Sequence, residues 1–297
     1  MTRQSPFRMA NIITFIAALL TIGTFVAIVM WPNAPATPAD TTPLTERPLA
    51  EALNDELTHA YLTTLHRVEP KLSRELHETA EQAIADGATQ DDLAIMVISA
   101  YNIGLRHGFD DFIKADVKYF EKMLKLIQTE LSSLSFNDSK FCRMASLETL
   151  SQQTPEQAIA EIQTMLAYDS RTYQWVLRYS VLKLLAIDDG RTNPKSYKRM
   201  TRADKAEFQA MFMRLLRSRS FAQLSTARSA SPVAQRQALK TMNLCKVGAE
   251  ALAAVNNLPP DMKSRMLIEL KKMQKKSEIK KQARELFGDS CGLCSAF

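Results

Sequence analysis

The longest uninterrupted apolar segment of the chain lies close to its start. Ile12 to Trp31 comprises twenty consecutive uncharged, mostly apolar residues. At a rise of about 1.5 Å per residue, a helix of this length spans roughly 30 Å, which is the thickness of the hydrocarbon core of a bilayer. The pattern therefore predicts a membrane-spanning anchor over 12–31, preceded by a short tail over 1–11.

The charges on either side of this segment predict its orientation. Arg3 and Arg8 precede it, and the first basic residue after it is Arg47. Because basic residues beside a span tend to stay in the cytoplasm, we expect residues 1–11 inside the cell and the rest of the chain outside. A bacterial inner membrane with the body in the periplasm is the expected setting.

A cleaved signal peptide is the alternative interpretation of the same segment. Ala34-Pro35-Ala36 offers a small-residue cleavage site, but signal peptides have apolar regions of only about 7–15 residues. The length of the segment therefore favours a retained anchor. Five prolines between Pro32 and Pro48 then predict an extended, semi-rigid linker over 32–48.

The remaining chain, 49–297, shows helical rather than strand periodicity. Apolar residues recur three and four positions apart, as between Phe112 and Ile127, and the whole chain has only 8 Gly. Capping residues such as Thr89 and Thr201, and a stop at Gly87, mark helix ends. The pattern predicts an all-α body with helices near 49–67, 70–86, 90–105, 109–134, 138–152, 155–168, 171–187, 202–218, 232–256 and 261–287.

Two all-helical architectures fit this pattern. Three segments, 141–150, 176–185 and 244–253, share a basic residue among small and apolar positions, and they loosely resemble the second helix of a HEAT repeat. That resemblance implies an α-solenoid of stacked helical hairpins. The default expectation is an irregular multi-helix bundle. The least helical stretch, 188–200, is the candidate for a subdomain boundary or an exposed loop.

The four cysteines are compatible with two disulfides in an extracytoplasmic body. Cys142 and Cys245 occupy matching places in two of the similar segments, so a disulfide between them and two buried free thiols are both open. Cys291 and Cys294 form a CxxC motif, which allows either a thiol–disulfide factor or a local disulfide. The motif follows a helix without a βαβ pattern, which favours the local disulfide.

One short segment gathers groups that could carry out catalysis. Arg106, His107, Asp110 and Asp111 lie at a helix junction, where a carboxylate could orient the histidine as a general base. This allows a membrane-tethered hydrolase acting on the cell wall. The alternative is a tight helix–helix corner with Asp110 as an N-terminal cap. No cofactor or metal site is predicted, because CxxC has no further Cys or His ligands nearby.

Basic residues are concentrated in two regions of the body. One cluster runs from Arg191 to Lys205, and the larger one supplies a predicted interaction surface: Lys263, Arg265, Lys271, Lys272, Lys275, Lys276, Lys280, Lys281 and Arg284. Such clusters suit anionic lipid or an acidic partner, whereas the placement outside the cytoplasm argues against nucleic acid. The sequence thus favours a non-catalytic scaffold that docks onto another protein.

Overall fold

The computed structural model describes residues 48–137, 139, 142–143, 163–218, 220–221 and 242–272, with only the backbone over 101–107. Within these residues all regular structure is helical, apart from an isolated bridge between Arg143 and Asn243. The described part contains no helix long and apolar enough to cross a membrane. The predicted anchor over 12–31 lies outside the described residues and stays a prediction.

Four helices form the first part of the body: α2 (Pro48–Ala52), α3 (Glu56–Val68), α4 (Pro70–Ala85) and α5 (Gln90–His107). The prediction of a single helix over 49–67 is wrong, because the helical backbone is interrupted before Glu56. Asp55 has an extended backbone, and its side chain accepts a hydrogen bond from the N–H of Thr58. This cap starts a new helix, so α2 and α3 are separate elements.

The later helices are α6 (Phe109–Phe112), α7 (Val117–Phe136), α10 (Arg171–Thr192), α11 (Arg202–Leu216), α14 (Leu244–Asn256) and the helical residues 260–272. The helix predicted over 109–134 is interrupted, because the side chain of Asp116 caps α7 by accepting from the N–H of Lys118. Helix α10 also continues to Thr192, into the stretch expected to be least helical, and 193–201 is the connector that follows.

Several predicted helix ends are confirmed by hydrogen bonds. Thr201 and Asp204 form a reciprocal capping box at the start of α11, and Thr89 bonds reciprocally with Asp92 at the start of α5. Gly87, after α4, has a φ of +87°, which favours glycine. The single helix predicted over 232–256 is interrupted, because Asn243 has an extended backbone and caps Leu244–Asn256, whereas the predicted start at 232 lies outside the described residues.

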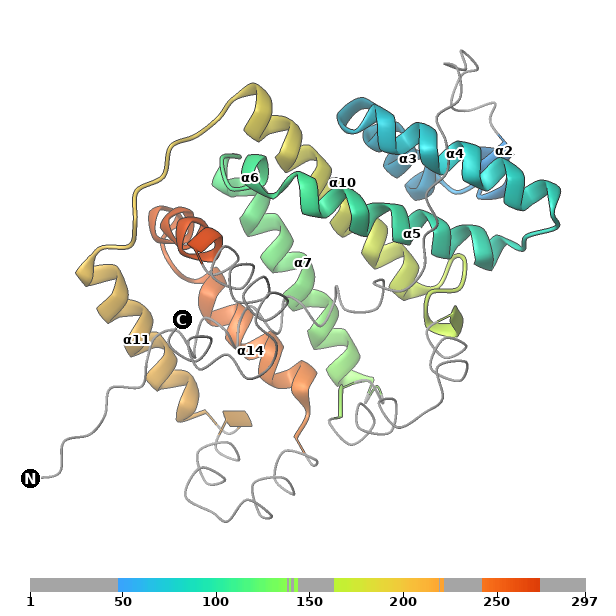
Figure 1. The fold of residues 1–297 in the computed structure, drawn as a ribbon. Coiled ribbons are helices and arrows are strands. Elements are labelled where there is room, and N and C mark those ends of the chain that lie inside the picture. Colours follow the sequence, from blue (N-terminus) through green and yellow to red (C-terminus); the bar gives the residue numbers. More distant parts are fainter. Residues whose placement is uncertain are drawn as a thin grey trace, which may run out of the picture.

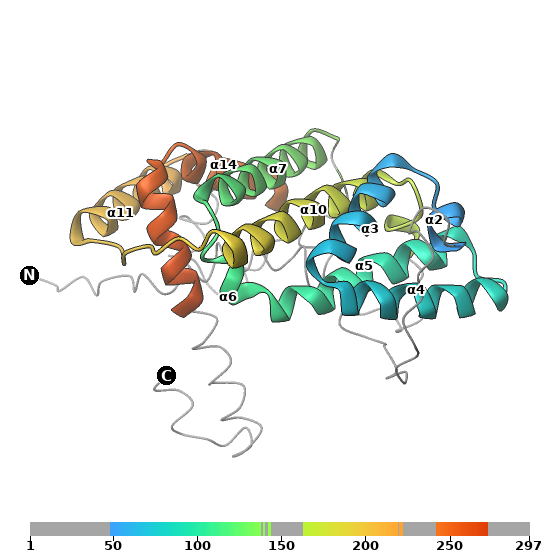
Figure 2. The ribbon, with the colours of Figure 1, turned by 90° about the horizontal axis from the view of Figure 1, so that it is seen from above.

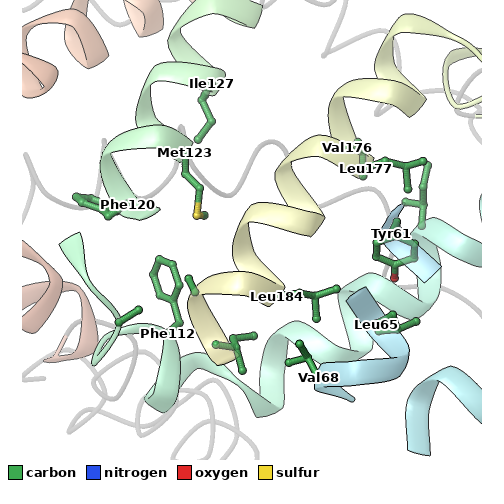
Figure 3. Close-up of a cluster of buried hydrophobic side chains, with 14 of the residues drawn as sticks. Tyr61, Leu65, Val68, Phe112, Phe120, Met123, Ile127, Val176, Leu177 and Leu184 are labelled. Carbon is green, nitrogen blue, oxygen red and sulfur yellow. The ribbon is translucent and has the colours of Figure 1, made fainter. Parts of the chain in front are cut away.

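Helix α10 occupies the centre of the body and packs against α3, α5, α6 and α7 (Figure 1). Figure 3 shows apolar side chains meeting across these helices, with Leu184 of α10 and Leu65 of α3 in one part and Phe112 and Met123 in another. Most buried apolar side chains form one cluster that includes residues from Leu49 to Leu267, and a second, smaller cluster contains Phe221, Met242, Val247 and Ala251. Burial of this apolar area supplies the main free energy of folding.

Helix α14 lies along α7 and is linked covalently to the segment that follows α7. Cys142, in the segment after α7, forms a disulfide with Cys245 in the first turn of α14, and both residues are buried. Asn256, at the end of α14, donates a hydrogen bond to Gln128 in the middle of α7. The two helices therefore run antiparallel. Of the two bonded cysteines, only Cys245 lies in a described α-helix.

The body is elongated, with α2–α5 at one end and α11 at the opposite end (Figure 2). Helix α10 connects the two halves through a close crossing with α6. A Cβ atom at Gly190 would lie only 1.9 Å from the carbonyl oxygen of Asp111, so a residue without a side chain is required there. This crossing places the connector 193–201 and α11 beyond the α6 corner.

Candidate interaction surface

The corner predicted to hold catalytic groups is formed by the end of α5 and by α6. Arg106 and His107 are the last two residues of α5, and their side chains are outside the described part of the structure. The carboxylate of Asp110 lies 2.8 Å from Nζ of Lys271, whereas that of Asp111 accepts a 2.9 Å hydrogen bond from Nε of Arg191. The two carboxylates are therefore engaged with different partners.

Arg191 connects three separate segments at this corner. Besides Asp111, its guanidinium donates to the carbonyl oxygen of Val68 at 2.7 Å and to the carboxylate of Glu69. Partial burial lowers the pKa of Arg191, but the hydrogen bonds to Asp111 and Glu69 outweigh this and raise it. These bonds join α3, α6 and α10, so Arg191 has a structural role.

The expectation that Asp110 caps a helix is wrong. The N-cap of α6 is Gly108, which makes no side-chain cap, and Asp110 lies in the first turn of the helix. A carboxylate in a first turn still interacts favourably with the helix dipole. In the described residues no group of three His, Cys, Asp or Glu side chains could hold a metal ion.

The larger predicted basic cluster is only partly described. Its described members are Lys263, Arg265, Lys271 and Lys272, and each of them forms an ion pair within the chain. The other predicted members lie outside the described residues, as do the two CxxC cysteines: Lys275, Lys276, Lys280, Lys281, Arg284, Cys291 and Cys294.

Three of these ion pairs attach residues 260–272 to the rest of the body. Lys263, whose side chain is only 7% exposed, lies 2.6 Å from the carboxylate of Glu121 on α7. Arg265 bonds to Asp204 on α11 at 2.7 Å, and Lys271 reaches Asp110 on α6. These side chains hold helices together, so their charges are largely satisfied inside the molecule.

The Arg265 contact has a measurable consequence for Asp204. The hydrogen bond from Arg265, with further bonds from Thr201, lowers the pKa of Asp204 to about 2. We expect Arg265→Gln to raise this pKa toward the ordinary value of 3.8. A lowered carboxyl pKa stabilises the fold above about pH 4, and this contribution is lost as the pH falls toward 2. The variant should therefore lose less stability between pH 4 and pH 2.

Carboxyl titration by NMR measures the Asp204 pKa directly. Lys272→Gln is the matched control, because Lys272 pairs with Glu269 of its own helix and makes no contact with Asp204. That variant should leave the Asp204 pKa unchanged. An unchanged pKa in Arg265→Gln would show that Thr201, rather than Arg265, keeps this carboxylate ionised.

The smaller basic cluster is arranged differently. Its exposed cations extend along the connector and α11, and together they define the basic surface: Lys195, Lys198, Arg199, Arg202, Lys205, Arg214 and Arg217. Within the described part of the chain, none of the seven forms an ion pair. The acidic residues of this region are Asp204, which bonds to Arg265, and Glu207. The basic surface therefore keeps a strong net positive charge.

Backbone and aromatic contacts hold the connector against the body. The N–H of Lys195 donates to the carbonyl oxygen of Lys114 at 2.7 Å, and the hydroxyl of Tyr197 donates to that of Ala115 at 2.8 Å. Met200 is buried at the end of the connector. These contacts fix the backbone while the basic side chains of Lys198 and Arg199 stay exposed.

Helix α11 adds a weakly apolar strip to the basic surface. Phe208 and Met211 face the core, whereas Ala206, Gln209 and Met213 lie on the outer face, and Met213 is 47% exposed. A flexible apolar side chain surrounded by cations suits contact with another macromolecule.

Sequence reasoning could not show which cations are paired inside the molecule, because it compared only the numbers of charges. The partners Glu121, Asp204 and Asp110 lie far from residues 260–272 in sequence, so no local pattern reveals the pairing. Reasoning from sequence also missed Lys183, which is buried on α10 with its Nζ 5.7 Å from the centre of the Phe112 ring. Burial lowers its pKa to about 7.

Comparison with known proteins gives no relative for this chain. No protein-family model, no curated protein and no solved structure is significantly similar to it. Its function is therefore inferred from the geometry of its own residues.

Proposed function

We propose that this chain is a single-pass protein of a bacterial inner membrane whose helical body stands in the periplasm and docks onto another protein. The supporting observation is the basic surface, where seven exposed cations have no ion-pair partner among the described residues. The cations near the carboxyl terminus of the described chain are instead paired internally. Unpaired, clustered charge is available for an external partner.

The position of the basic surface supports a protein partner rather than the bilayer. The linker enters the body at Pro48, beside α2, whereas the basic surface lies at the opposite end of the elongated body (Figure 2). The proposed anchor therefore does not itself hold the basic surface against lipid. A partner with exposed carboxylates would be steered to this end by the long-range field of the cations.

For the whole body we propose an irregular bundle around α10 rather than a HEAT-like solenoid. In a solenoid each repeat contacts only its neighbours. Helix α10 instead packs against α3, α5, α6 and α7, which lie in distant parts of the sequence (Figure 1). No described contact favours the alternative hydrolase, because the carboxylates of Asp110 and Asp111 are held in ion pairs.

Site-specific photo-crosslinking in native membranes tests the docking proposal. A photoreactive residue in place of Gln209, on the outer face of α11, should yield one defined adduct with a protein. The charge-reversal variant Lys198→Glu/Arg199→Glu/Arg202→Glu, carrying the same probe, should lose at least about nine-tenths of this adduct. Glutamate at position 202 suits the first turn of α11, so the variant is expected to fold.

The matched control reverses three exposed cations elsewhere: Arg74→Glu/Lys122→Glu/Lys125→Glu. It changes the net charge by the same amount but leaves the basic surface intact, so the adduct from position 209 should persist. Equal adduct yields in the two variants would show that the basic surface does not dock a partner.

A further inference from the structure

The end of the body opposite the basic surface carries the opposite charge. From Glu75 to Leu105 the chain contains six acidic residues and neither Lys nor Arg. This segment covers most of α4, the turn at Gly87 and α5. The four exposed or half-exposed carboxylates between positions 81 and 92, together with one on α2, define the acidic end: Glu51, Glu81, Asp86, Asp91 and Asp92. Glu75, outside this end, pairs with Lys71.

Hydrogen bonds at the acidic end leave its negative charge in place. The carboxylate of Asp86 accepts from the side-chain amide of Gln82, and that of Asp91 accepts from the backbone N–H of Tyr168. Asp92 accepts from Thr89. All three donors are neutral, and no ion pair involving the acidic end occurs among the described residues. The acidic end is thus as available for charge pairing as the basic surface.

We propose that the basic surface binds the acidic end of a second copy of this chain. The inference rests on the proposed function and names the partner. Figure 2 shows α11 at one end of the body and α2 and α4 toward the opposite end, with α10 running between them. Two copies placed side by side and antiparallel bring each basic surface against an acidic end, so that both charged regions are used in one closed, two-fold symmetric pair.

The proposed membrane anchor and linker are compatible with this antiparallel pair. The two linkers would leave the pair from opposite ends, beside each copy's α2. Pro48 begins α2, so the predicted proline-rich linker outside the body covers the 16 residues 32–47. At about 3.1 Å per residue such a linker would extend to about 50 Å, so both anchors can reach one bilayer when the pair lies along it.

Charge exchange between two variants of the full chain in nonionic detergent tests the pairing. The basic-reversed variant is Lys198→Glu/Arg199→Glu/Arg202→Glu, and the acid-reversed variant is Glu51→Lys/Glu81→Lys/Asp86→Lys. Asp91 and Asp92 are left unchanged because each accepts a hydrogen bond from a backbone N–H, that of Tyr168 and of Thr89 respectively. Sedimentation velocity should show dimers for the wild type, and each variant alone should raise the dimer dissociation constant at least about tenfold.

The mixture of the two variants gives the decisive result. The basic-reversed variant keeps its acidic end and the acid-reversed variant keeps its basic surface, so the mixture retains one native contact that neither variant can make alone. An equimolar mixture should therefore form a one-to-one dimer more tightly than either variant by itself. Raising the salt from 0.1 M to 1 M shortens the screening length from about 10 Å to about 3 Å, and it should weaken this dimer. The control Arg74→Glu/Lys122→Glu/Lys125→Glu should dimerise like the wild type.

Three outcomes would overturn the inference: a monomeric wild type, wild-type affinity in the acid-reversed variant, or a mixture that stays monomeric. The photo-crosslinking experiment distinguishes failure of the proposed dimer from failure of the proposed docking function. If the acid-reversed chain still gives the position-209 adduct and the basic-reversed chain does not, the basic surface docks a different acidic protein. If neither reversal reduces the adduct, the basic surface is not a docking site at all.

Discussion

Replacing Cys142 and Cys245 together by alanine is expected to lower the free energy of unfolding by about 3–5 kcal/mol. The two cysteines are 103 residues apart, so their disulfide closes a long loop and removes much of the conformational freedom of the unfolded chain. The bond also joins the segment after α7 to the start of α14. Denaturant unfolding of the oxidised wild type and of the double variant measures the difference.

The reduced wild type separates the covalent link from the packing of the sulfur atoms. It keeps both buried sulfurs but lacks the bond, so it should lose nearly as much stability as the double variant. Single variants are unsuitable, because a free thiol at either position could exchange with Cys291 or Cys294. If the reduced and oxidised wild type unfold at the same denaturant concentration, the disulfide does not constrain the unfolded chain.

Replacing Lys183 by methionine is expected to stabilise the fold by about 2–4 kcal/mol at pH 6. The Lys183 side chain lies in the apolar interior, where burial lowers its pKa from 10.5 to about 7. Below pH 7 the folded protein must hold a buried ammonium group, and the nearby Phe112 ring compensates only in part. Methionine has a similar length and carries no charge.

The pH dependence identifies the cause of this effect. Between about pH 7 and 10 the unfolded chain binds a proton at Lys183 that the folded chain has released, so wild-type stability should rise with pH over this range. The gain from methionine should accordingly shrink toward zero near pH 10. Lys125→Met, at an exposed site on α7, is the control and should change stability little at either pH. A gain that is equal at pH 6 and pH 10 would exclude the titration of Lys183 as its cause.

Local signals predicted the helical class and several helix ends correctly. The reciprocal bonds of Thr201 with Asp204 and of Thr89 with Asp92 depend on side chains three residues apart, and the left-handed backbone at Gly87 depends on one residue. Such features are fully contained in a short stretch of sequence.

Other features could not be predicted from any single short segment of the sequence. The side chains of Asp55 and Asp116 cap new helices within long apolar stripes. Because helical periodicity continues on either side, the sequence pattern does not reveal that the helices are interrupted there. The pairing of Lys263 with Glu121 and of Arg265 with Asp204 depends on which helices meet, as does the burial of Lys183. Tertiary packing therefore decided which basic residues are internal and which belong to the basic surface.

Chemical labelling of the basic surface from outside the cell tests the central claim most directly. A membrane-impermeant reagent that couples to amines and then photoreacts with any neighbouring residue is added to intact spheroplasts. We expect Lys195, Lys198 and Lys205 to become linked to a second polypeptide without permeabilisation, as identified by mass spectrometry. Labelling of these lysines only after the membrane is permeabilised would contradict the proposed topology, and labelling that never yields a link to another polypeptide would contradict docking.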